Sequence, residues 1–209
     1  MHNALHQDEA LPGAVIAGGG DIEQREATRY TLLIRAAKLL CDAGEFLCVI
    51  RDVSESGISV RTFHRLPPAA RMVVELQNGD RHEMEPIWQK DDRAGFRFVH
   101  QADIDRIIVS PSRYAKRAIR LNLSAPAVIE KAGGRREDVE IVDLSQQGAK
   151  IACDCRFALD ERVKLSAAGL PETNAKVRWR KDGGCGLIFE DTYQYGDFAR
   201  IAADLQLGE

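Results

Sequence analysis

The chain has 209 residues, of which 44% are hydrophobic and 29% are charged, and its formal net charge at pH 7 is -3. This composition is that of an ordinary globular protein, and the length allows one large domain or two domains of about 100 residues. The small negative charge argues against binding to a nucleic acid polymer, which would favour a basic excess. The five cysteines are odd in number and sparse, so we interpret them as reduced thiols rather than a disulfide framework or a zinc site.

The first twenty residues lack the basic region and apolar core of a signal peptide. No segment approaches the roughly 20 apolar residues that a membrane-spanning helix needs. We therefore expect a flexible tail over residues 1–20 and a cytoplasmic protein without membrane insertion.

Residues 21–110 predict a first domain of short strands, because β-branched and aromatic residues alternate with polar ones between Gly, Asp, Asn and Pro. The "NGD" at Asn78 is typical of a hairpin turn, and "DIDRIIVS" over 103–110 predicts a short helix that Pro111 ends. The strands are expected at 30–40, 46–54, 58–62, 72–76, 82–89 and 95–99.

Residues 111–209 predict a second domain with the same order of elements. A helix over 195–206 is indicated by Phe198, Ile201 and Leu205 at helical spacing. Six antiparallel strands in about 90 residues favour a small barrel without exposed edges. The expected fold is mainly β, with two tandem six-stranded antiparallel β-barrels of a split-barrel kind, each followed by a short C-terminal α-helix. The strands of the second domain are expected at 118–123, 139–143, 149–152, 163–166, 175–179 and 186–189.

The two halves repeat each other at a fixed distance, which indicates a duplication. "DVSESG" from Asp52 is answered by "DLSQQG" from Asp143, a shift of 91 residues. The same shift carries Trp88 to Trp179, and we assign both tryptophans to the barrel core or rim rather than to base stacking.

No catalytic constellation accompanies the repeat. The five histidines show no metal-ligand spacing, and the glycine-rich stretches lack the Lys-Ser/Thr of a phosphate loop. The sequence therefore predicts a protein that is not an enzyme, with no catalytic or metal-binding residues.

A pair of arginines four residues apart precedes each copy of the Asp-x-Ser-x-x-Gly stretch: Arg25 with Arg29, and Arg113 with Arg117. This spacing puts both guanidinium groups on one side of a helix or of a strand. Arginine forks bind phosphates and the acceptor edge of guanine, an aspartate accepts from the donor edge, and a glycine lets a planar base approach the backbone. The pattern predicts a guanine nucleotide site in each half.

Arg-x-x-x-Arg followed by Asp-x-Ser-x-x-Gly at the start of a small β-barrel resembles the PilZ family of cyclic di-GMP receptors. The resemblance covers nearly the whole chain after about residue 20, as a tandem PilZ-PilZ protein. It implies that the ligand is cyclic di-GMP, that no other cofactor is needed, and that an unidentified protein effector receives the signal in motility, biofilm, exopolysaccharide or developmental control. The implied ligand-binding residues are Arg25, Arg29, Asp52, Ser54 and Gly57 for site 1, and Arg113, Arg117, Asp143, Ser145 and Gly148 for site 2.

Some alternatives stay open at this point. Asp, Ser and Gly suit a turn with or without a ligand. Acidic residues surround Arg25 and Arg29, whereas the arm of site 2 has none. The second interpretation is a tandem β-barrel protein-interaction module in which one or both sites no longer bind nucleotide. Arg35, Arg51 and Arg120 are considered as supplements to a site but are not assigned.

Overall fold

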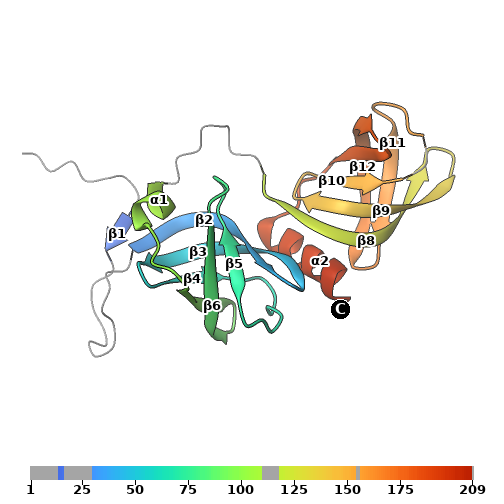
Figure 1. Ribbon diagram of the computed structural model, residues 1–209. Helices are drawn as coiled ribbons and strands as arrows, with labels where there is room; N and C mark the ends of the chain where they lie inside the picture. Colours follow the sequence, from blue (N-terminus) through green and yellow to red (C-terminus); the bar gives the residue numbers. More distant parts are fainter. Residues whose placement is uncertain (1–13, 17–29, 110–117, 154–155, 209) are drawn as a thin grey trace, which may run out of the picture.

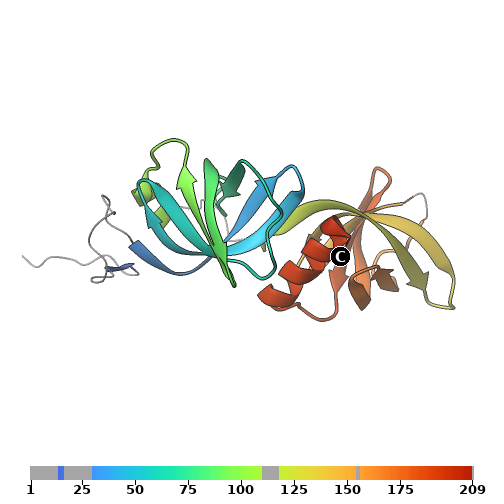
Figure 2. The same ribbon diagram turned by 90° about the horizontal axis from the view of Figure 1, so that it is seen from below.

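The computed structural model describes residues 14–16, 30–109, 118–153 and 156–208 (Figure 1). Two antiparallel β-barrels lie next to each other, and the C-terminal helix packs between them (Figures 1 and 2). Among the described residues, no helix is long and apolar enough to cross a membrane.

Barrel 1 is a seven-stranded sheet in the order β1-β2-β3-β4-β7-β6-β5, and an additional pairing of β2 with β5 closes six of its strands into a barrel. A short helix, α1, follows the last strand. The elements are β1 Ala14–Ile16, β2 Tyr30–Cys41, β3 Gly44–Ser54, β4 Gly57–Arg61, β5 Met72–Glu75, β6 Arg81–Lys90, β7 Arg93–Phe98 and α1 Ile104–Val109.

Barrel 2 is closed in the order β10-β13-β12-β11-β8-β9, with β9 paired to β10. Its strands are in the same relative positions along the chain as β2 to β7 of barrel 1. The elements are β8 Arg120–Lys131, β9 Arg136–Ser145, β10 Gly148–Ala152, β11 Arg162–Ala167, β12 Leu170–Lys181, β13 Gly184–Phe189 and α2 Tyr195–Leu207.

The predicted fold of two six-stranded barrels with a helix after each is confirmed, although several strands are longer than expected. Strand β8 continues past residue 123 through Pro126. This is tolerated because pairing with β11 begins only at Ala127, so Pro126 pairs on one side, with Glu140 of β9. Strand β1 lies within the predicted tail and was not expected; residues 1–13 and 17–20, like the predicted domain boundary at 110/111, lie outside the described residues.

Each barrel encloses its own apolar core, built from the inward-facing residues that alternate with outward-facing ones along each strand. Phe46, Ile50 and Met84 are among the buried side chains of barrel 1. Ile129 and Ile141 belong to the core of barrel 2, onto which α2 packs with Phe198, Ile201 and Leu205, as the sequence predicted. Burying one such side chain stabilises the fold by roughly 1.5–3 kcal/mol relative to exposing it.

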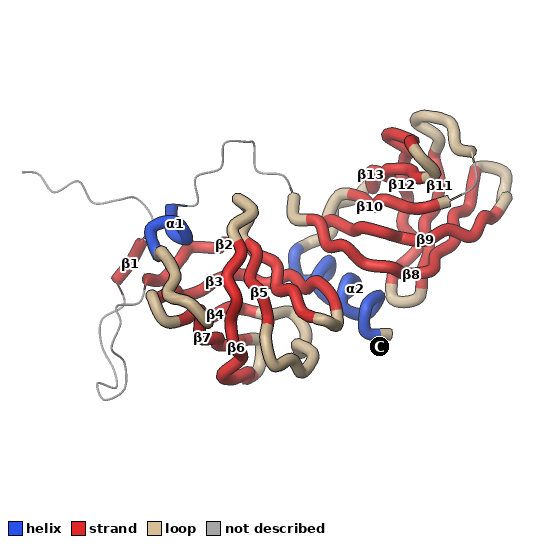
Figure 3. The backbone as a smooth tube through the Cα atoms, in the orientation of Figure 1, coloured by secondary structure: helices blue, strands red, loops and turns tan. Residues whose placement is uncertain are grey.

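The two barrels meet through the hairpin that joins β2 and β3. Ala36 and the fully buried Leu47 of barrel 1 are part of the apolar cluster of barrel 2, and Ala203 of α2 is part of the cluster of barrel 1. Figure 3 shows α2 in this position between the two sets of strands. The helix therefore belongs to barrel 2 in sequence but contacts both barrels.

Polar contacts centred on Glu45 complete this contact surface. The Glu45 carboxylate accepts hydrogen bonds from the backbone N–H and the side-chain amide of Asn122 in β8, at 2.9 and 2.8 Å. Gln206 of α2 brackets the Glu45 backbone, accepting from its N–H at 2.8 Å and donating to its carbonyl at 2.8 Å. Lys38 bridges the carboxylates of Glu45 and Glu75 at 3.3 and 2.7 Å. We call this group of five residues the joint.

Candidate ligand-binding sites

Both Asp-x-Ser-x-x-Gly stretches form a tight hairpin turn between two strands. Ser54 pairs with Gly57 across the β3–β4 turn, and Ser145 pairs with Gly148 across the β9–β10 turn. Both serines are buried, and each hydroxyl donates to the carbonyl of its paired glycine, at 3.3 Å in barrel 1 and 3.0 Å in barrel 2. The hydroxyl proton of each serine is therefore used inside the turn, which leaves its lone pairs for other donors.

The motif glycines stand where a neighbouring strand comes very close. A Cβ atom at Gly57 would lie 2.4 Å from the carbonyl oxygen of Phe96 in β7, and one at Gly148 would lie 2.1 Å from that of Leu187 in β13. Any side chain would thus push the strands apart. The close approach is to a strand backbone, so the barrel itself requires glycine at both positions.

The motif aspartates have different partners in the two barrels. Asp52 accepts a hydrogen bond from the Ser59 hydroxyl at 2.8 Å. Asp143 instead accepts from Nη1 of Arg120 at 2.8 Å, as a salt bridge. The donor that Ser59 supplies to Asp52 is neutral, whereas the donor that Arg120 supplies to Asp143 is a cation.

Each aspartate belongs to a row of five residues that are directly paired across five neighbouring strands. We call it the aspartate row. In barrel 1 the row is Thr31, Asp52, Ser59, Gly95 and Trp88; in barrel 2 it is Asn122, Asp143, Lys150, Gly186 and Trp179. Residues paired in this way lie on the same side of a sheet, so one face of each barrel carries an aspartate near one end and a tryptophan at the other.

The tryptophan at the end of each row lies on the outer face. Trp88 is 46% exposed and Trp179 is 40% exposed, so of the two expected positions, barrel core or rim, the core does not apply. A Cβ atom at the paired Gly95 or Gly186 would lie 2.2 or 2.0 Å from the indole Nε1. Each indole therefore rests on a glycine backbone while part of its surface stays open to solvent.

The arginine arms predicted for the two sites, Arg25 with Arg29 and Arg113 with Arg117, lie outside the described residues. Their roles stay predictions. Residues 110–117, which include the arm of site 2, connect the end of α1 to barrel 2.

Arg35, considered as a supplement to a site, serves the helix instead. Its guanidinium donates to the carbonyls of Ile107 and Ile108 at the end of α1, the second at 2.6 Å. Burial lowers the pKa of Arg35 from its ordinary value. These bonds satisfy carbonyls that a helix end leaves without partners, and they hold the end of α1 against β2.

Arg120, also left unassigned, is the arginine that contacts a motif residue in the described part of the chain. A signal in the sequence could have found it. Arg120 follows Arg29 by 91 residues, the shift that relates Asp143 to Asp52, whereas Arg117 follows Arg29 by only 88. The Arg-x-x-x-Arg pattern ends at Arg117 and therefore does not include Arg120.

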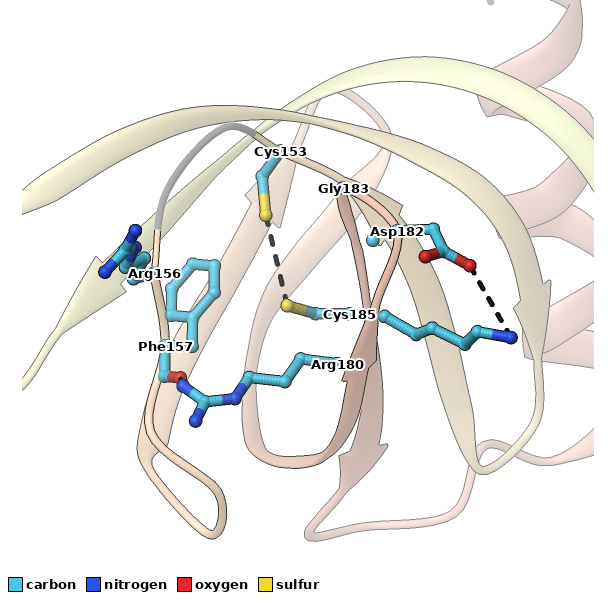
Figure 4. A pocket seen from close by; sticks show the side chains of 9 residues that line it. Cys153, Arg156, Phe157, Arg180, Asp182, Gly183 and Cys185 are labelled. Carbon is cyan, nitrogen blue, oxygen red and sulfur yellow. Dashed lines mark hydrogen bonds and ion pairs between the residues drawn. The ribbon is translucent and has the colours of Figure 1, made fainter.

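A separate cavity of about 390 Å³ opens at the other end of β10 from the motif turn (Figure 4). Cys153 and Cys185 place their sulfur atoms 4.0 Å apart there, and Arg180 donates to the carbonyl of Phe157. Since β10 begins at Gly148 and ends at Ala152, the cavity lies a strand length away from site 2. Within the described ranges, no three His, Cys, Asp or Glu residues are grouped as metal ligands.

Comparison with known proteins places the chain in a family. The PilZ domain model matches residues 23–109 and again residues 112–202. No curated protein matches the chain.

Similar solved structures include PlzA from Borreliella burgdorferi in complex with c-di-GMP (12% identity, 80% of this chain and 87% of that chain, TM-score 0.32). Others are the motility inhibitor MotI/DgrA of Bacillus subtilis (13%, 84% and 97%, 0.36) and YcgR of Escherichia coli in complex with c-di-GMP (12%, 83% and 84%, 0.35). Because the two family matches together span most of its length, the chain belongs to the PilZ domain family and carries two PilZ domains in tandem.

Proposed function

We propose that this protein is a receptor for cyclic di-GMP that relays the level of this second messenger to a protein partner in the cytoplasm. The observation that carries the proposal is the aspartate row: both barrels present the motif aspartate on one face, on the strand that enters the motif turn. Membership of the PilZ family supports the ligand, and the PlzA and YcgR structures are complexes with c-di-GMP.

The chemistry of the row suits a guanine base. A carboxylate such as Asp52 or Asp143 accepts hydrogen bonds only, and the N1–H and N2–H groups of guanine are donors. A carboxylate has about four acceptor positions, so the bond from Arg120 to Asp143 leaves room for the base. The arginine pairs predicted for each site would supply the complementary donors to phosphate and to guanine O6 and N7.

The output is proposed to be a change in how the barrels contact each other. Asn122 begins the aspartate row of barrel 2 and is held by Glu45 of barrel 1. The predicted arm of site 2 lies in the connection between the barrels. A ligand on site 2 would therefore act on two attachments between the barrels, and a protein effector would detect the new arrangement. Motility, biofilm or exopolysaccharide production and development are the processes that we propose for it.

Calorimetric titration tests this proposal. We expect wild type to bind cyclic di-GMP and not GTP. Arg25→Ala/Arg29→Ala should remove site 1, and Arg113→Ala/Arg117→Ala should remove site 2, because each lost bidentate contact costs about 1–3 kcal/mol. Arg135→Ala/Arg136→Ala is a matched control, since both arginines are about three-quarters exposed on the β8–β9 hairpin, at the far end of these strands from the motif turn.

Absence of binding heat with wild type would contradict the receptor proposal and leave the interaction module as the better description. Equal affinity in wild type and both arm variants would show that a ligand binds elsewhere. Small-angle scattering with saturating cyclic di-GMP tests the output separately, because an unchanged distance distribution would contradict a change in barrel arrangement.

A further inference from the structure

We propose that Cys153 and Cys185 of barrel 2 form a thiol–disulfide exchange site, which reacts with an anionic low-molecular-weight disulfide of the glutathione class. The inference goes beyond the proposed receptor function and does not depend on it. Both thiols line the cavity of about 390 Å³ at the end of β10 opposite the motif turn (Figure 4). This volume is within the range of small-molecule sites in proteins.

The pairing of β10 with β13 brings the two sulfur atoms together. Cys185 pairs with the fully buried Ile151, and Cys153 follows Ile151 by two residues. The backbone N–H of Cys153 donates to the carbonyl of Gly183 at 3.0 Å, which continues the pairing past the end of β10. Because side chains alternate along a strand, both thiols are directed to the inner side of the barrel wall, and their sulfur atoms are 4.0 Å apart. Side-chain rotation has to close about 2 Å between them to form a disulfide.

The two thiols differ in their access to the cavity. Cys153 is half-buried, whereas Cys185 is only 3% exposed. A small molecule that enters the cavity therefore meets Cys153 more readily. This difference assigns the first attack to Cys153 and the second, within the protein, to Cys185.

Cationic side chains surround the pair. Arg156, Arg180 and Lys181 line the cavity, and among the described lining residues the acid is Asp182, which lies 3.6 Å from Lys181 as an ion pair. Arg180 is held at the cavity because its guanidinium donates to the carbonyl of Phe157. Positive charge favours the thiolate, which is the nucleophile in disulfide exchange, and it attracts carboxylates. The whole chain has a net charge of -3, so a preference for an anion here is a local property.

Barrel 1 shows that the fold does not need these thiols. The residues of barrel 1 that stand 91 positions before Cys153, Cys185 and Arg180 are Thr62, Ala94 and Gln89. The strand register confirms the match, because Ala94 pairs with Gln89 as Cys185 pairs with Arg180. Threonine and alanine fill the same places in a closed barrel, so packing alone does not account for two cysteines beside an arginine.

The proposed exchange has two steps. The thiolate of Cys153 attacks one sulfur of the small disulfide, whose S–S bond breaks, and the small thiolate that leaves takes up the proton that Cys153 released. The product is a mixed disulfide on Cys153. The Cys185 thiol then loses its proton and attacks the Cys153 sulfur, which expels the second small thiolate, and this thiolate takes up that proton. Two electrons pass from the protein thiols to the small disulfide, which becomes two small thiols.

The experiment treats the reduced full-length chain with glutathione disulfide and maps its cysteines by peptide mass spectrometry. The chain carries Cys155→Ser, because Cys155 lies outside the described residues and is close to Cys153 in sequence. We expect a peptide in which Cys153 is linked to Cys185, with a mass lower by two hydrogen atoms, and reversal by dithiothreitol. Cys185→Ala should stop the reaction at a glutathione adduct on Cys153, and Cys153→Thr should leave Cys185 unmodified.

A second disulfide of opposite charge tests the class of the ligand. Cystamine is cationic, and its rate and that of glutathione disulfide are each divided by the rate with the urea-unfolded chain. We expect this ratio to be at least about 10-fold higher for glutathione disulfide, because a cationic site concentrates anions. Arg180→Gln should reduce the preference several-fold. Arg97→Gln is the matched control: it removes the same charge from an exposed arginine of barrel 1 and should leave the preference unchanged.

The opposite results are equally specific. A native chain in which Cys153 and Cys185 stay reduced, or react only after unfolding, would overturn the exchange site. Equal ratios for the two probes, or a preference that Arg180→Gln leaves unchanged, would overturn the anionic class. Thermal unfolding checks each variant, and Cys185→Ser replaces Cys185→Ala if the alanine variant does not fold. Cyclic di-GMP is absent from these measurements, so their failure would leave the receptor proposal as it stands.

Discussion

The two barrels share their packing and differ in the residues of the aspartate row. In both, the motif glycine touches a strand backbone and a tryptophan covers another glycine. The position beside the aspartate that Ser59 occupies in barrel 1 is occupied by Lys150 in barrel 2, where Arg120 also forms a salt bridge with Asp143. The duplicated halves have thus retained the contacts that close the barrel and have diverged in the side chains of the aspartate row.

The helices that follow the two barrels also differ, because one contacts its own barrel and the other contacts both. The six-residue α1 packs on its own barrel through Ile104 and Ile107, and Arg35 holds its end. The thirteen-residue α2 contributes to both apolar clusters and brackets Glu45 through Gln206. Only site 2 is therefore directly attached, through Asn122, to the contact between the barrels within the described residues.

The largest effects are expected at the motif glycines. Gly148→Ala and Gly57→Ala should each destabilise the fold by about 3 kcal/mol or more, because the new Cβ would overlap a backbone carbonyl. The effect of Gly148→Ala should be the greater, since its Cβ would lie 2.1 Å from the carbonyl oxygen, against 2.4 Å at Gly57. Urea unfolding measures both free energies.

Gly184→Ala is the control for these variants. Gly184 lies on β13 and pairs with β10, the same two strands that Gly148 joins. A Cβ atom at Gly184 would lie 3.3 Å from its nearest atom. A loss of stability in Gly184→Ala as large as in Gly148→Ala would show that the overlap is not the cause.

A somewhat smaller effect is expected at the joint. Glu45→Ala should cost about 1–3 kcal/mol, because it removes the acceptor for both N–H donors of Asn122 and one partner of Lys38. It should also change cyclic di-GMP affinity at site 2 more than at site 1, since Asn122 is in the aspartate row of barrel 2. Unfolding and titration of the two single-site arm variants measure these changes.

Glu130→Ala serves as the comparison for Glu45→Ala. It removes a half-buried carboxylate that pairs with the exposed Arg136, and ion pairs open to solvent contribute roughly 0–1 kcal/mol. If Glu45→Ala changed the affinity of both sites equally, the asymmetry between the barrels would not extend to the joint.

Exchanging Ser59 and Lys150, the middle residues of the two aspartate rows, should change the affinity for the ligand by a few-fold. Lys150 makes no ion pair within the described part of the chain, so its charge is available to a phosphate. We expect Lys150→Ser to weaken binding at site 2 by about 2- to 5-fold and to reduce its salt dependence. Ser59→Lys should do the opposite at site 1. Titrations at low and high salt measure both, and equal salt dependence in all variants would remove the charge argument.

The smallest effect concerns pH. Burial lowers the pKa of His82 from its ordinary value near 6.5, with Asp80 and Asp103 opposing and Arg106 reinforcing the shift. The unfolded chain then binds the proton more readily, so stability present above about pH 6.5 is lost as the pH falls through the lowered pKa. Unfolding at pH 7 and pH 5 should show a smaller loss of stability in His82→Thr than in wild type.

Thr173 is the reason for choosing threonine. It occupies the corresponding place in barrel 2, where its hydroxyl lies 2.7 Å from the carbonyl of Pro171 and 2.5 Å from the Tyr193 hydroxyl. An equal acid sensitivity in wild type and His82→Thr would assign the pH dependence to other groups.

The strands and turns could be predicted from the sequence because they depend on local patterns. Alternation along β4 and β11 and the Asp-x-Ser-x-x-Gly turn are encoded in neighbouring residues. The place of the tryptophans on the outer face was not predicted, because apolar character alone does not say which face of a strand is enclosed. It depends on the pairing of Trp88 with Gly95 and of Trp179 with Gly186, which comes from the register.

The relation between Arg120 and Asp143 and the contacts of Glu45 were missed for a similar reason. They join residues 23 and 77 positions apart in the chain, so no local pattern contains them. The strand β1 was missed because three residues beside β2 are too short a signal to distinguish from a tail.

The shared burial at the joint determines how the two halves can be studied. A fragment ending after α1 would expose Ala36 and Leu47, and a fragment beginning at β8 would expose the side of α2 that carries Ala203. Either fragment would present a new apolar surface to solvent and would invite self-association. Separate expression of the halves would thus confuse the properties of a site with those of a cut surface, and point variants in the intact chain are the sound way to assign ligand binding to one barrel or the other.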